Sequence, residues 1–571
     1  MYSFKELKKF SKKEIEGTEY KVAVLGNVST QFVSLGIKGA LKAEGINASV
    51  FDADYNQIES QLIDTMSDTY QHAPEVILLY LSTDKLYEEF MDLEVNEQSN
   101  FAEGYIKKIE NYWDLISKNS NAKIIQTNFT EIDDKVFGNY SSKLEASFTY
   151  QIRKLNYLLE ESMSNRKGVY SLDLLSIQIQ MGVRSFYDTV LYYSAKMAVT
   201  MDAVEYIAKN VVDIVKAFKG LTKKAIILDL DNTLWGGVIG DDGLGGIEIG
   251  ELGSGHVFTD FQRWLKQLKN RGILLCVCSK NNEDIAKEPF EKHEEMILKL
   301  DDFSMFVANW EDKASNIKYI QKTLNIGMDS IVFIDDNPFE RNLVKSMIPE
   351  ICVPELPENA AEYLSFLQKE NLFETVSYSS DDKDRTKQYQ AEAKRQTLMQ
   401  EFVSIDDYLK NLEMVGEAKP FDELRFSRIA QLTQRSNQFN LRTVRYTEAD
   451  IEKMASDEKY ITLYFTLKDK FGDHGLVSVV ILEKKSDKAA FVDTWLMSCR
   501  VLKRGMEEYV VNSFVRAAAD NNIETIYSEY IETPKNKMVK DIYKVMGFTE
   551  TSTNNYALKI KDYVNKETFI N

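Results

Sequence analysis

The chain has few cysteines, histidines and prolines, and each shortage excludes a class of protein. Four cysteines in 571 residues cannot build a disulfide framework, and they form no C-x-x-C metal pattern. The 4 histidines have no zinc-like spacing. With only 8 prolines and 26 glycines, the chain has no room for long Pro-rich or Gly-rich linkers. Helices or short polar segments must therefore join its domains.

The chain also lacks long apolar runs and an excess of positive charge. No uncharged run reaches the roughly 18 residues of a membrane helix, and the lysine-rich start precedes too short an apolar run for a secretion signal. The net charge of −19, from 70 basic and 89 acidic residues, repels a nucleic-acid backbone. We therefore expect a cytoplasmic protein without nucleic-acid or membrane partners. A local basic pocket for a small phosphate remains possible.

The alternation of strand-like and helix-like stretches predicts an α/β protein of three domains, because the chain is too long for one core. From Tyr20 to about residue 180, short apolar runs alternate with amphipathic stretches, including a long helix expected at 194–219, as in a parallel sheet. A second such unit begins near Thr222, and mixed strands and helices follow Met414. The predicted segments are 1–220, 221–375, a solvated helical connector at 376–412, and 413–571.

Two pairs of carboxylates follow apolar strands of the second segment. Asp229 and Asp231 come directly after the strand Ala225 to Leu228, and Asp335 with Asp336 follows another apolar strand. Carboxylates two residues apart can point into one crevice, the first as nucleophile and the second as general acid and base. Magnesium would relieve their mutual repulsion and would also neutralise a phosphate. Taken alone, either pair also fits ordinary turn or helix-cap residues.

The order of the motifs favours chemistry over turns. Thr233 completes D-x-D-x-T, Ser279 ends the strand-like ILLCVCS, and Lys313 opens a helix before the final Asp-Asp pair. From about 222 to 360 the chain resembles the haloacid dehalogenase phosphatase superfamily. The resemblance implies that Asp229 attacks phosphorus, that Asp231 donates a proton, and that Ser279 and Lys313 hold phosphate. It further implies that the magnesium ligands come from Asp229, Asp231, Asp335 and Asp336.

The connections between these motifs are too short for a cap domain, and 233–258 fits a glycine-rich hairpin. The site is then open, which predicts a large substrate, such as a protein-bound group, or a lid from the flanking domains.

Further motifs resemble FkbH-like proteins, namely WGGVIGDDG, CSKNN, DDNPFERN, RSNQFNLRT, DKFGDHG, SCRVLKRGMEE and TPKNKMVKDIYKVMGF. The resemblance covers about 220–560 and, more loosely, the N-terminal segment. It implies removal of phosphate from 1,3-bisphosphoglycerate and loading of the glyceryl group onto the thiol of an acyl carrier protein, as in polyketide pathways. Two alternatives remain: a phosphatase for a phosphorylated metabolite or sugar, and a non-catalytic scaffold, against which the filled motifs argue.

A thiol next to the phosphate-binding serine could carry the acyl group. Cys278 precedes Ser279, and Cys276 should face the same way because side chains alternate along a strand. Near lysine and magnesium, Cys278 could be partly thiolate. The alternative is that both are small buried hydrophobes.

The C-terminal segment resembles the Gcn5-related acetyltransferase fold, in which a loop and a helix N-terminus hold the diphosphate of coenzyme A. The resemblance implies coenzyme A or a phosphopantetheine arm as the ligand, although Lys503 replaces the expected first glycine of the loop. The alternative is a structural domain that only docks a partner. The implied cofactor residues are Arg500, Lys503, Arg504, Gly505, Asn536 and Tyr543.

The N-terminal segment resembles SGNH-type hydrolases in layout. Its one histidine, His72, lacks the Asp-x-x-His spacing that a serine hydrolase base needs. Asn27 and Ser29, after the first strand, then fit turn or helix-cap residues. We expect a lid or docking domain that is not an active hydrolase.

Overall fold

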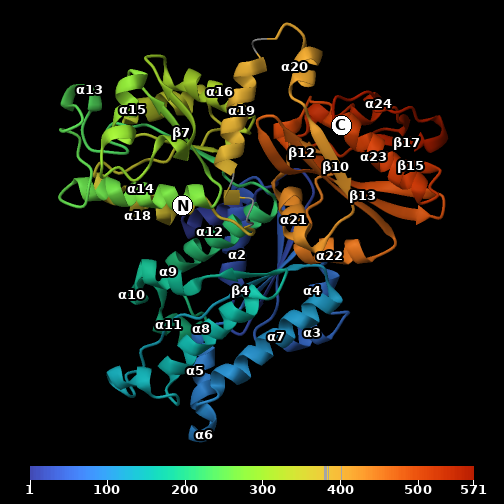
Figure 1. The fold of residues 1–571 in the computed structure, drawn as a ribbon. Coiled ribbons are helices and arrows are strands. Elements are labelled where there is room, and N and C mark those ends of the chain that lie inside the picture. The colour runs from blue at the N-terminus through green and yellow to red at the C-terminus, as the bar shows by residue number, and fades with distance from the viewer. Residues whose placement is uncertain (379–381, 384, 400–401) are drawn as a thin grey trace. The chain divides into compact units, whose positions relative to one another are not determined.

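The computed structural model describes residues 1–378, 382, 383, 385–399 and 402–571. The chain divides into two compact units, Met1–Val215 and Lys216–Asn571. The first unit contains a parallel sheet, and the second contains one parallel and one mixed sheet (Figure 1). The expected α/β class with three sheets is confirmed. The finer division into four segments stays a prediction.

The sheet of the first unit is parallel throughout, in the order β2-β1-β3-β4-β5. The sequence of β3, VILLY, is fully buried, as expected for a strand that helices cover on both faces. The strands are β1 (Tyr20–Gly26), β2 (Ala48–Asp52), β3 (Val76–Tyr80), β4 (Lys123–Thr127) and β5 (Val169–Leu172).

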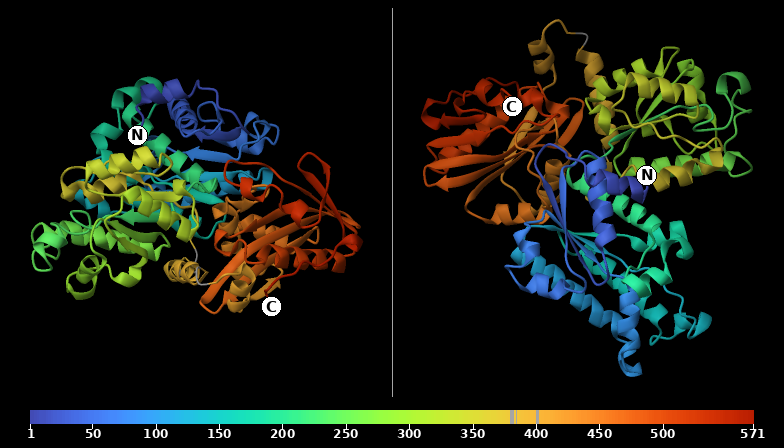
Figure 2. Two further views of the ribbon diagram at one scale, coloured as in Figure 1. Left: turned by 90° about the horizontal axis from the view of Figure 1, so that it is seen from above. Right: turned by 180° about the vertical axis from the view of Figure 1, so that it is seen from behind.

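Amphipathic helices pack on this sheet, and Figure 2 shows them from two further sides. Gly39 lets α1 lie against α2, because a Cβ at this position would lie 2.1 Å from the carbonyl oxygen of Leu7. The helices are α1 (Phe4–Phe10), α2 (Gln31–Ala43), α3 (Ile58–Ile63), α4 (Asp68–Gln71), α5 (Thr83–Met91), α6 (Val95–Gln98), α7 (Phe101–Asn119), α8 (Phe148–Ser164), α9 (Leu174–Met181), α10 (Val183–Phe186), α11 (Thr189–Ala195) and α12 (Met201–Phe218).

The single long helix expected at 194–219 is interrupted. Lys196 adopts a left-handed conformation (φ 51°) and ends α11, and α12 begins at Met201. The apolar periodicity continued across this break, so the pattern alone did not reveal it.

The parallel sheet of the second unit has the order β8-β7-β6-β9. Alternate residues of β6 enter two cores: Ile226 and Leu228 lie on one face, and Ala225 and Ile227 on the other. The strands are β6 (Ala225–Leu228), β7 (Leu274–Ser279), β8 (Phe303–Ala308) and β9 (Ile331–Ile334). The helices are α13 (Ile239–Asp242), α14 (Gly255–Asn270), α15 (Glu283–Lys292), α16 (Lys313–Leu324), α17 (Pro338–Met347) and α18 (Tyr363–Glu370).

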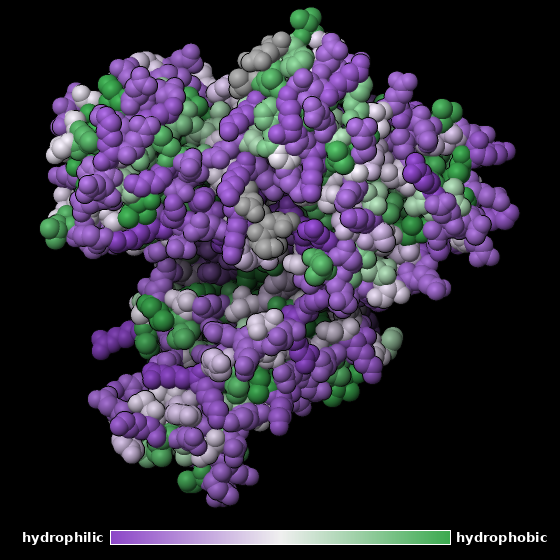
Figure 3. Space-filling view, in the orientation of Figure 1, coloured by the Kyte–Doolittle hydropathy of each residue, from purple (hydrophilic) through white to green (hydrophobic). Residues whose placement is uncertain are grey.

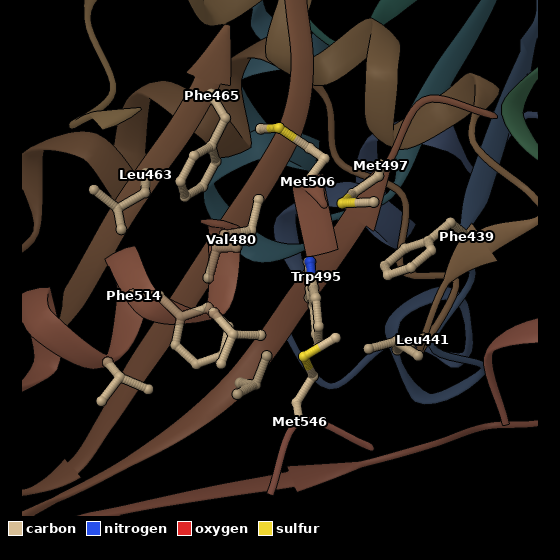
Figure 4. Close-up of a cluster of buried hydrophobic side chains, with 14 of the residues drawn as sticks. Phe439, Leu441, Leu463, Phe465, Val480, Trp495, Met497, Met506, Phe514 and Met546 are labelled. Atoms are coloured by element: carbon tan, nitrogen blue, oxygen red, sulfur yellow. The ribbon is translucent and has the colours of Figure 1, made fainter. Parts of the chain in front are cut away.

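The mixed sheet follows the order β10-β12-β13-β14-β15-β17-β16, and β11 pairs with β14 off this path. Its core centres on Trp495, whose ring centroid lies 5.3 Å from that of Phe439 and 5.7 Å from that of Phe514 (Figure 4). The elements are β10 (Val415–Lys419), α21 (Phe426–Arg435), β11 (Phe439–Asn440), α22 (Glu448–Ser456), β12 (Tyr460–Asp469), β13 (Gly472–Ser486), β14 (Ala489–Met497), α23 (Met506–Asp520), β15 (Thr525–Glu529), α24 (Ile542–Val545), β16 (Thr549–Ser552) and β17 (Asn555–Lys559).

The predicted connector contains helices α19 (Arg385–Met399) and α20 (Ile405–Asn411), and α19 is not solvated along its length. Its residues Tyr389, Glu392 and Arg395 are buried, because α19 packs against α16 and β8 on one side and against β13 on the other. The expectation of a solvated helix is therefore wrong for α19. Residues 379–381, 384, 400 and 401 of the predicted connector lie outside the described residues.

Polar residues cover most of the face seen in Figure 3. In the described part of the chain, no helix combines the length and the apolar character that a membrane crossing requires.

Candidate active site

Three carboxylates meet at the carboxyl edge of the parallel sheet of the second unit. Asp229 follows β6, and Asp335 and Asp336 follow β9, which pairs with β6 in register from Ala225 and Ile331 to Leu228 and Ile334. One carboxylate oxygen of each of the three residues lies within 4.8 Å of the others. The parallel pairing therefore brings together acids that are more than a hundred positions apart, as the sequence predicted.

Lys313, the first residue of α16, lies among these acids. Its Nζ is 2.6 Å from Oδ2 of Asp229 and 2.5 Å from Oδ2 of Asp335, and its side chain is only 3% exposed. Burial alone would lower the pKa of Lys313, but the two carboxylates outweigh it and raise that pKa. Lys313 is thus a fixed cation between the two acidic loops.

One ammonium group does not balance three carboxylates. Burial, and next the charge of Asp229, raise the pKa of Asp335 to about 6, and the same two causes raise that of Asp336. Oδ1 of Asp229 is buried, and among the described residues no donor reaches it. An excess of oxygen ligands with a buried oxygen left unsatisfied is the donor set that a hard divalent cation such as Mg²⁺ prefers. The residues therefore fit the metal that the sequence implied.

The carboxylate of Asp231 is not part of this cluster. It accepts hydrogen bonds from Trp235 Nε1 (3.1 Å), from the backbone N–H of Ile239 (2.9 Å) and from Asn281 Nδ2 (2.7 Å). We therefore correct the expectation that this carboxylate binds the metal, since both of its oxygens are engaged elsewhere. Its expected role as proton donor stays a prediction.

Thr233 and Ser279 are both buried beside the acids. The hydroxyl of Thr233 accepts a hydrogen bond from the backbone N–H of Asp336 (3.2 Å) and so links the two acidic loops. Ser279 ends β7, the strand next to β6, so it reaches the same edge of the sheet.

Three residues that support the site, Asn281, Arg341 and Lys280, lie within the motifs CSKNN and DDNPFERN, but the sequence alone predicted no role for them. Asn281 holds Asp231, and Arg341 Nη1 donates to the carbonyl oxygens of Asp335 (2.8 Å) and Asp336 (2.6 Å). Lys280 Nζ lies 2.6 Å from Oε1 of Glu340. Their presence in CSKNN and DDNPFERN was the available signal.

The rim of the site is open. Residues 233–258 contain α13, one antiparallel bridge between Gly236 and Glu248 and the start of α14 at Gly255, with no folded insert. Residues 280–312 contain only α15, a short 3₁₀ turn and β8. At the two ends of the sheet, Trp310 after β8 is 71% exposed and Phe339 in α17 is 69% exposed. The expected absence of a cap holds for both segments.

Cys278 does not face the site. It is fully buried on the same face of the sheet as Cys276, in the core beneath α16, with its Sγ 3.7 Å from the carbonyl oxygen of Lys313. Burial raises the pKa of the Cys278 thiol far above its ordinary value, and Lys313 only partly offsets this. We therefore correct the expectation of a partial thiolate. The structure agrees with the alternative, a small buried hydrophobe.

The structure does not gather the six implied cofactor residues into one exposed site. Asn536 and Tyr543 are fully buried in the core, and Asn536 Nδ2 donates to the carbonyl oxygens of Asn440 and Ile531. Arg504 is buried against Glu392 of α19, with Nη2 2.6 Å from that carboxylate.

The loop itself lies between β14 and α23. Arg500 is buried there, Lys503 is exposed, and Gly505 takes a left-handed φ of 80° directly before α23. Burial lowers the pKa of Arg500. Binding of coenzyme A or phosphopantetheine by the six residues stays a prediction.

In the first unit, Asn27 is a turn residue, as expected. Its side-chain oxygen accepts a hydrogen bond from the backbone N–H of Ser82 (2.8 Å). Ser29 lies at the carboxyl edge of the sheet, whereas His72 precedes the amino end of β3. The two residues lie at opposite edges, so His72 cannot activate Ser29.

A parallel sheet that carries three clustered carboxylates and a lysine at its carboxyl edge defines a domain of the metal-dependent phosphoryl-transfer class. Residues 21–216 match the family model described as FkbH, N-terminal domain. A crystal structure of the N-terminal part of the protein BF1531 from Bacteroides fragilis, containing a phosphatase domain complexed with Mg, is 44% identical. The match has a TM-score of 0.63 and covers 66% of this chain and 100% of that chain. The chain therefore belongs to the FkbH family.

Weaker matches are acetyltransferases. The ribosomal-protein-S18-alanine N-acetyltransferase of Escherichia coli is 14% identical with a TM-score of 0.21, over 26% of this chain and 94% of that chain. The spermidine N-acetyltransferase of Vibrio cholerae, in complex with CoA and spermine, has the same identity and TM-score over 26% and 98%. These scores are too low to carry an inference. No curated protein matched the chain.

Proposed function

We propose that the chain is a magnesium-dependent phosphatase that acts on an acyl phosphate such as 1,3-bisphosphoglycerate and passes the acyl group to the thiol of an acyl carrier protein. The observation that carries the phosphatase chemistry is the unsatisfied, buried Oδ1 of Asp229, which lies with Asp335, Asp336 and Lys313. Membership of the FkbH family and the magnesium-bound phosphatase relative support it.

In this proposal Asp229 is the nucleophile. Lys313 holds Oδ2 of Asp229, which leaves Oδ1 as the oxygen that can attack phosphorus. Lys313 then faces the charge of the transferred phosphoryl group. The three N–H donors around Asp231 hold the Asp231 carboxylate in place for proton transfer. Bound at Asp229, Asp335 and Asp336, Mg²⁺ would neutralise phosphate charge. Positioning and charge neutralisation are the main requirements of phosphoryl transfer.

The acceptor of the acyl group is in this proposal a thiol from outside the chain, which attacks the acyl carbon and releases the phosphate bound to that carbon. Asp229 attacks the phosphate ester at the other end of the substrate, because attack at the phosphorus of the acyl phosphate would release an unactivated carboxylate. Cys278 is buried and its thiol resists ionisation, so it is a poor acyl carrier. The open rim with exposed Trp310 and Phe339 leaves space for a phosphopantetheine arm or for coenzyme A to approach. The same burial of Cys278 also favours a second candidate, a phosphatase that hydrolyses a phosphorylated metabolite or sugar without transfer.

One pair of variants tests the phosphatase chemistry. Asp229→Asn removes the nucleophile, and phosphate release from a phosphate ester should fall about a thousandfold or more. Asp241→Asn, an exposed acid of α13, is the matched control and should release phosphate as the wild type does. Activity that persists in Asp229→Asn, or in excess EDTA, would contradict the proposed site.

Transfer is tested separately. The full chain is incubated with 1,3-bisphosphoglycerate and a phosphopantetheinylated carrier protein, and the intact mass of the carrier is measured. A gain of one glyceryl group that depends on Asp229 supports transfer. Phosphate release without any change in carrier mass supports the hydrolytic alternative.

A further inference from the structure

Trp310 is held in a fixed position at the open rim of the acidic site. Its side chain is 71% exposed, and its indole N–H donates to Oδ1 of Asn282 at 2.9 Å. Asn282 is the N-cap residue of α15, but within the described chain its side chain accepts no capping hydrogen bond. The Asn282 amide therefore serves the indole instead of the helix. Ordering an exposed side chain costs entropy, so a ring held in this way suits a binding surface.

The backbone around Trp310 is held as well. The N–H of Asn309, directly before Trp310, donates to the carbonyl oxygen of Ser279 (3.2 Å) at the end of β7. The side chains of Asn309 and Asn316 exchange two hydrogen bonds, of 2.7 Å and 3.2 Å, which fasten the loop to α16. Trp310 therefore lies on a rigid connection between β8 and Lys313, the first residue of α16.

The hydrogen bond to Asn282 also places the indole beside the acid of the proposed reaction. Asn281, the neighbour of Asn282, donates from Nδ2 to Oδ2 of Asp231 at 2.7 Å. The Cα atoms of consecutive residues are about 3.8 Å apart, so one short loop holds both Asp231 and the indole. The leaving oxygen of a phosphate ester departs on the side of the acid that protonates it. Trp310 is thus next to the path of the leaving group.

The exposed ring lies beyond the edge of the sheet that carries the acids. Trp310 comes two residues after Ala308, the last residue of β8, and Ala308 pairs in register with Ser279. Two residues of extended chain span about 7 Å. Asp229 and Asp335 are buried at the edge itself. A leaving group of two or three carbons ends close to the phosphate, so only a longer chain reaches along the ring.

We propose that Trp310 is a specificity-determining residue that packs against the pantetheine chain of a phosphorylated acyl thioester. The proposal rests on the proposed function and adds an order to it: the acyl group passes to the thiol before the phosphate ester is cleaved. In the cleavage, Oδ1 of Asp229 forms the bond to phosphorus and the bond between phosphorus and the ester oxygen breaks. That oxygen takes the proton of Asp231 and leaves as an alcohol that carries the thioester. Water then releases the phosphate from Asp229.

The pantetheine chain is the one long group in the proposed reaction. It carries methyl groups and amides, and both pack on an aromatic ring. Phosphopantetheine on a carrier protein and coenzyme A share this chain, so either can be its source. A metabolite or sugar phosphate without such a chain would leave the indole exposed.

The test compares two phosphate esters with the full chain in Mg²⁺: the thioester of 3-phosphoglycerate with pantetheine, and free 3-phosphoglycerate. Trp310→Ala should raise KM for the thioester about tenfold and change kcat about twofold at most, because a contact kept from the bound state to the transition state affects binding alone. A tenfold change is about 1.4 kcal/mol, which corresponds to about 55 Å² of covered apolar surface. KM for 3-phosphoglycerate should change about twofold at most. The matched control is Tyr319→Ala, an aromatic residue of α16 that is 54% exposed, and it should behave as wild type with both esters.

Asn282 is a positioning residue in this proposal, and two variants test it. Asn282→Ala frees the indole and should raise KM for the thioester about threefold, because part of the binding energy then goes into ordering the ring. Asn282→Asp keeps an acceptor for the indole N–H and should restore the wild-type KM. Equal KM values for wild type, Trp310→Ala and Asn282→Ala, or an equal loss with both esters, would overturn the proposal.

Tryptophan fluorescence gives a readout that does not depend on turnover. Acrylamide should quench chiefly Trp310, because the other four tryptophans are buried or half-buried, namely Trp113, Trp235, Trp264 and Trp495. The thioester, added to Asp229→Asn, should protect Trp310 from acrylamide, and 3-phosphoglycerate should not. If Asp229→Asn loses phosphate release but the thioester gives no protection, only the role of Trp310 is overturned. If Trp310 is protected but phosphate release persists in Asp229→Asn, the contact with the chain stands and the proposed phosphatase chemistry falls.

Two further arms separate the sources of the chain. The same kinetics are measured with the thioester on coenzyme A and with the thioester on a phosphopantetheinylated carrier protein. A lower KM on coenzyme A identifies a free cofactor, and a lower KM on the carrier identifies a protein partner. A KM that depends on Trp310 with either one supports the proposal, and a KM that depends on Trp310 with neither overturns it.

Discussion

Replacing Lys313 by methionine removes the one ammonium group that lies between Asp229 and Asp335, at 2.6 Å and 2.5 Å from their oxygens. With an effective dielectric constant of about 20, each contact is an attraction of about 6 kcal/mol. Burying the ions costs several kcal/mol apiece, so the net loss on breaking such a buried pair is about 3–5 kcal/mol. We expect Lys313→Met to lose about this much stability in EDTA, because two buried carboxylates then face each other without a cation.

Magnesium should reverse part of this loss. A ligand that binds only the folded state stabilises it in proportion to the logarithm of its concentration over the dissociation constant. Since the variant site has one more uncompensated negative charge, it should hold Mg²⁺ more tightly than wild type. The shift in unfolding that Mg²⁺ causes should therefore be larger in Lys313→Met, even though phosphate release is lost.

The assay is chemical unfolding of the full chain, with and without Mg²⁺, followed by tryptophan fluorescence. Lys318→Met is the control, since Lys318 is exposed on the same helix α16 and should change stability by about 0.5 kcal/mol or less. If Lys313→Met matched wild type in EDTA, or gained no more from Mg²⁺, then Lys313 would not compensate the acids in the way described here.

Three other changes give distinct outcomes. Cys278→Ala should cost on the order of 1 kcal/mol and change carrier loading and simple phosphate hydrolysis alike, because the thiol belongs to the core; selective loss of loading would contradict this. Burial outweighs the hydrogen bond to Asp469 and lowers the pKa of His474 from 6.5 to about 4. The unfolded chain then binds more protons between these values, so stability should fall as pH drops through this window, and His474→Asn should flatten the slope measured by unfolding at several pH values. Arg504→Met removes the closer of the two arginines that pair with the buried carboxylate of Glu392, since Arg395 lies at 3.5 Å, and should cost about 3 kcal/mol in urea unfolding.

The sequence predicted the acidic cluster well because each of its members follows its own strand. A polar residue at the carboxyl end of an apolar run is a local signal, and parallel pairing of β6 with β9 then brings Asp229 and Asp335 together. The direction of the Asp231 side chain has no local signal. It is set by Asn281, fifty positions away, and by the turn that brings Trp235 back.

Strand alternation placed Cys276 and Cys278 on one face, as the structure confirms. Which face of β7 would be covered by α16 is decided by tertiary packing, so the alternation could not tell a thiol at the site from one in the core. The same limit applies to Asn536 and Tyr543: their positions in a motif fit a cofactor, but both side chains are buried in the core.

The prediction that the charge pattern gave for α19, a solvated helix, was wrong. A helix rich in Lys, Arg and Glu is usually solvated, and the sequence contains no sign of what its charges meet. In the structure Arg395 pairs with Asp469 at 2.7 Å and Glu392 with Arg504 at 2.6 Å, while Gln390 donates to the carbonyl oxygen of Phe303. Asp469 and Arg504 lie about 75 to 110 positions later in the chain and Phe303 nearly 90 positions earlier, all beyond the reach of any window of local sequence.

The acidic cluster and the ion pair between Asp329 and Lys535 lie at opposite ends of β9, a strand of four residues, so the two should act independently. Four residues of a strand span about 13 Å, and effects of substitutions more than about 10 Å apart usually add. Lys313→Met and Lys535→Gln share no partner, since the former faces Asp229 and Asp335 and the latter Asp329. In EDTA, the stability lost by the double variant should therefore equal the sum of the two single losses within about 0.5 kcal/mol. A larger difference would show that β9 transmits a change at one edge to the other, and the two sites could then no longer be treated as separate.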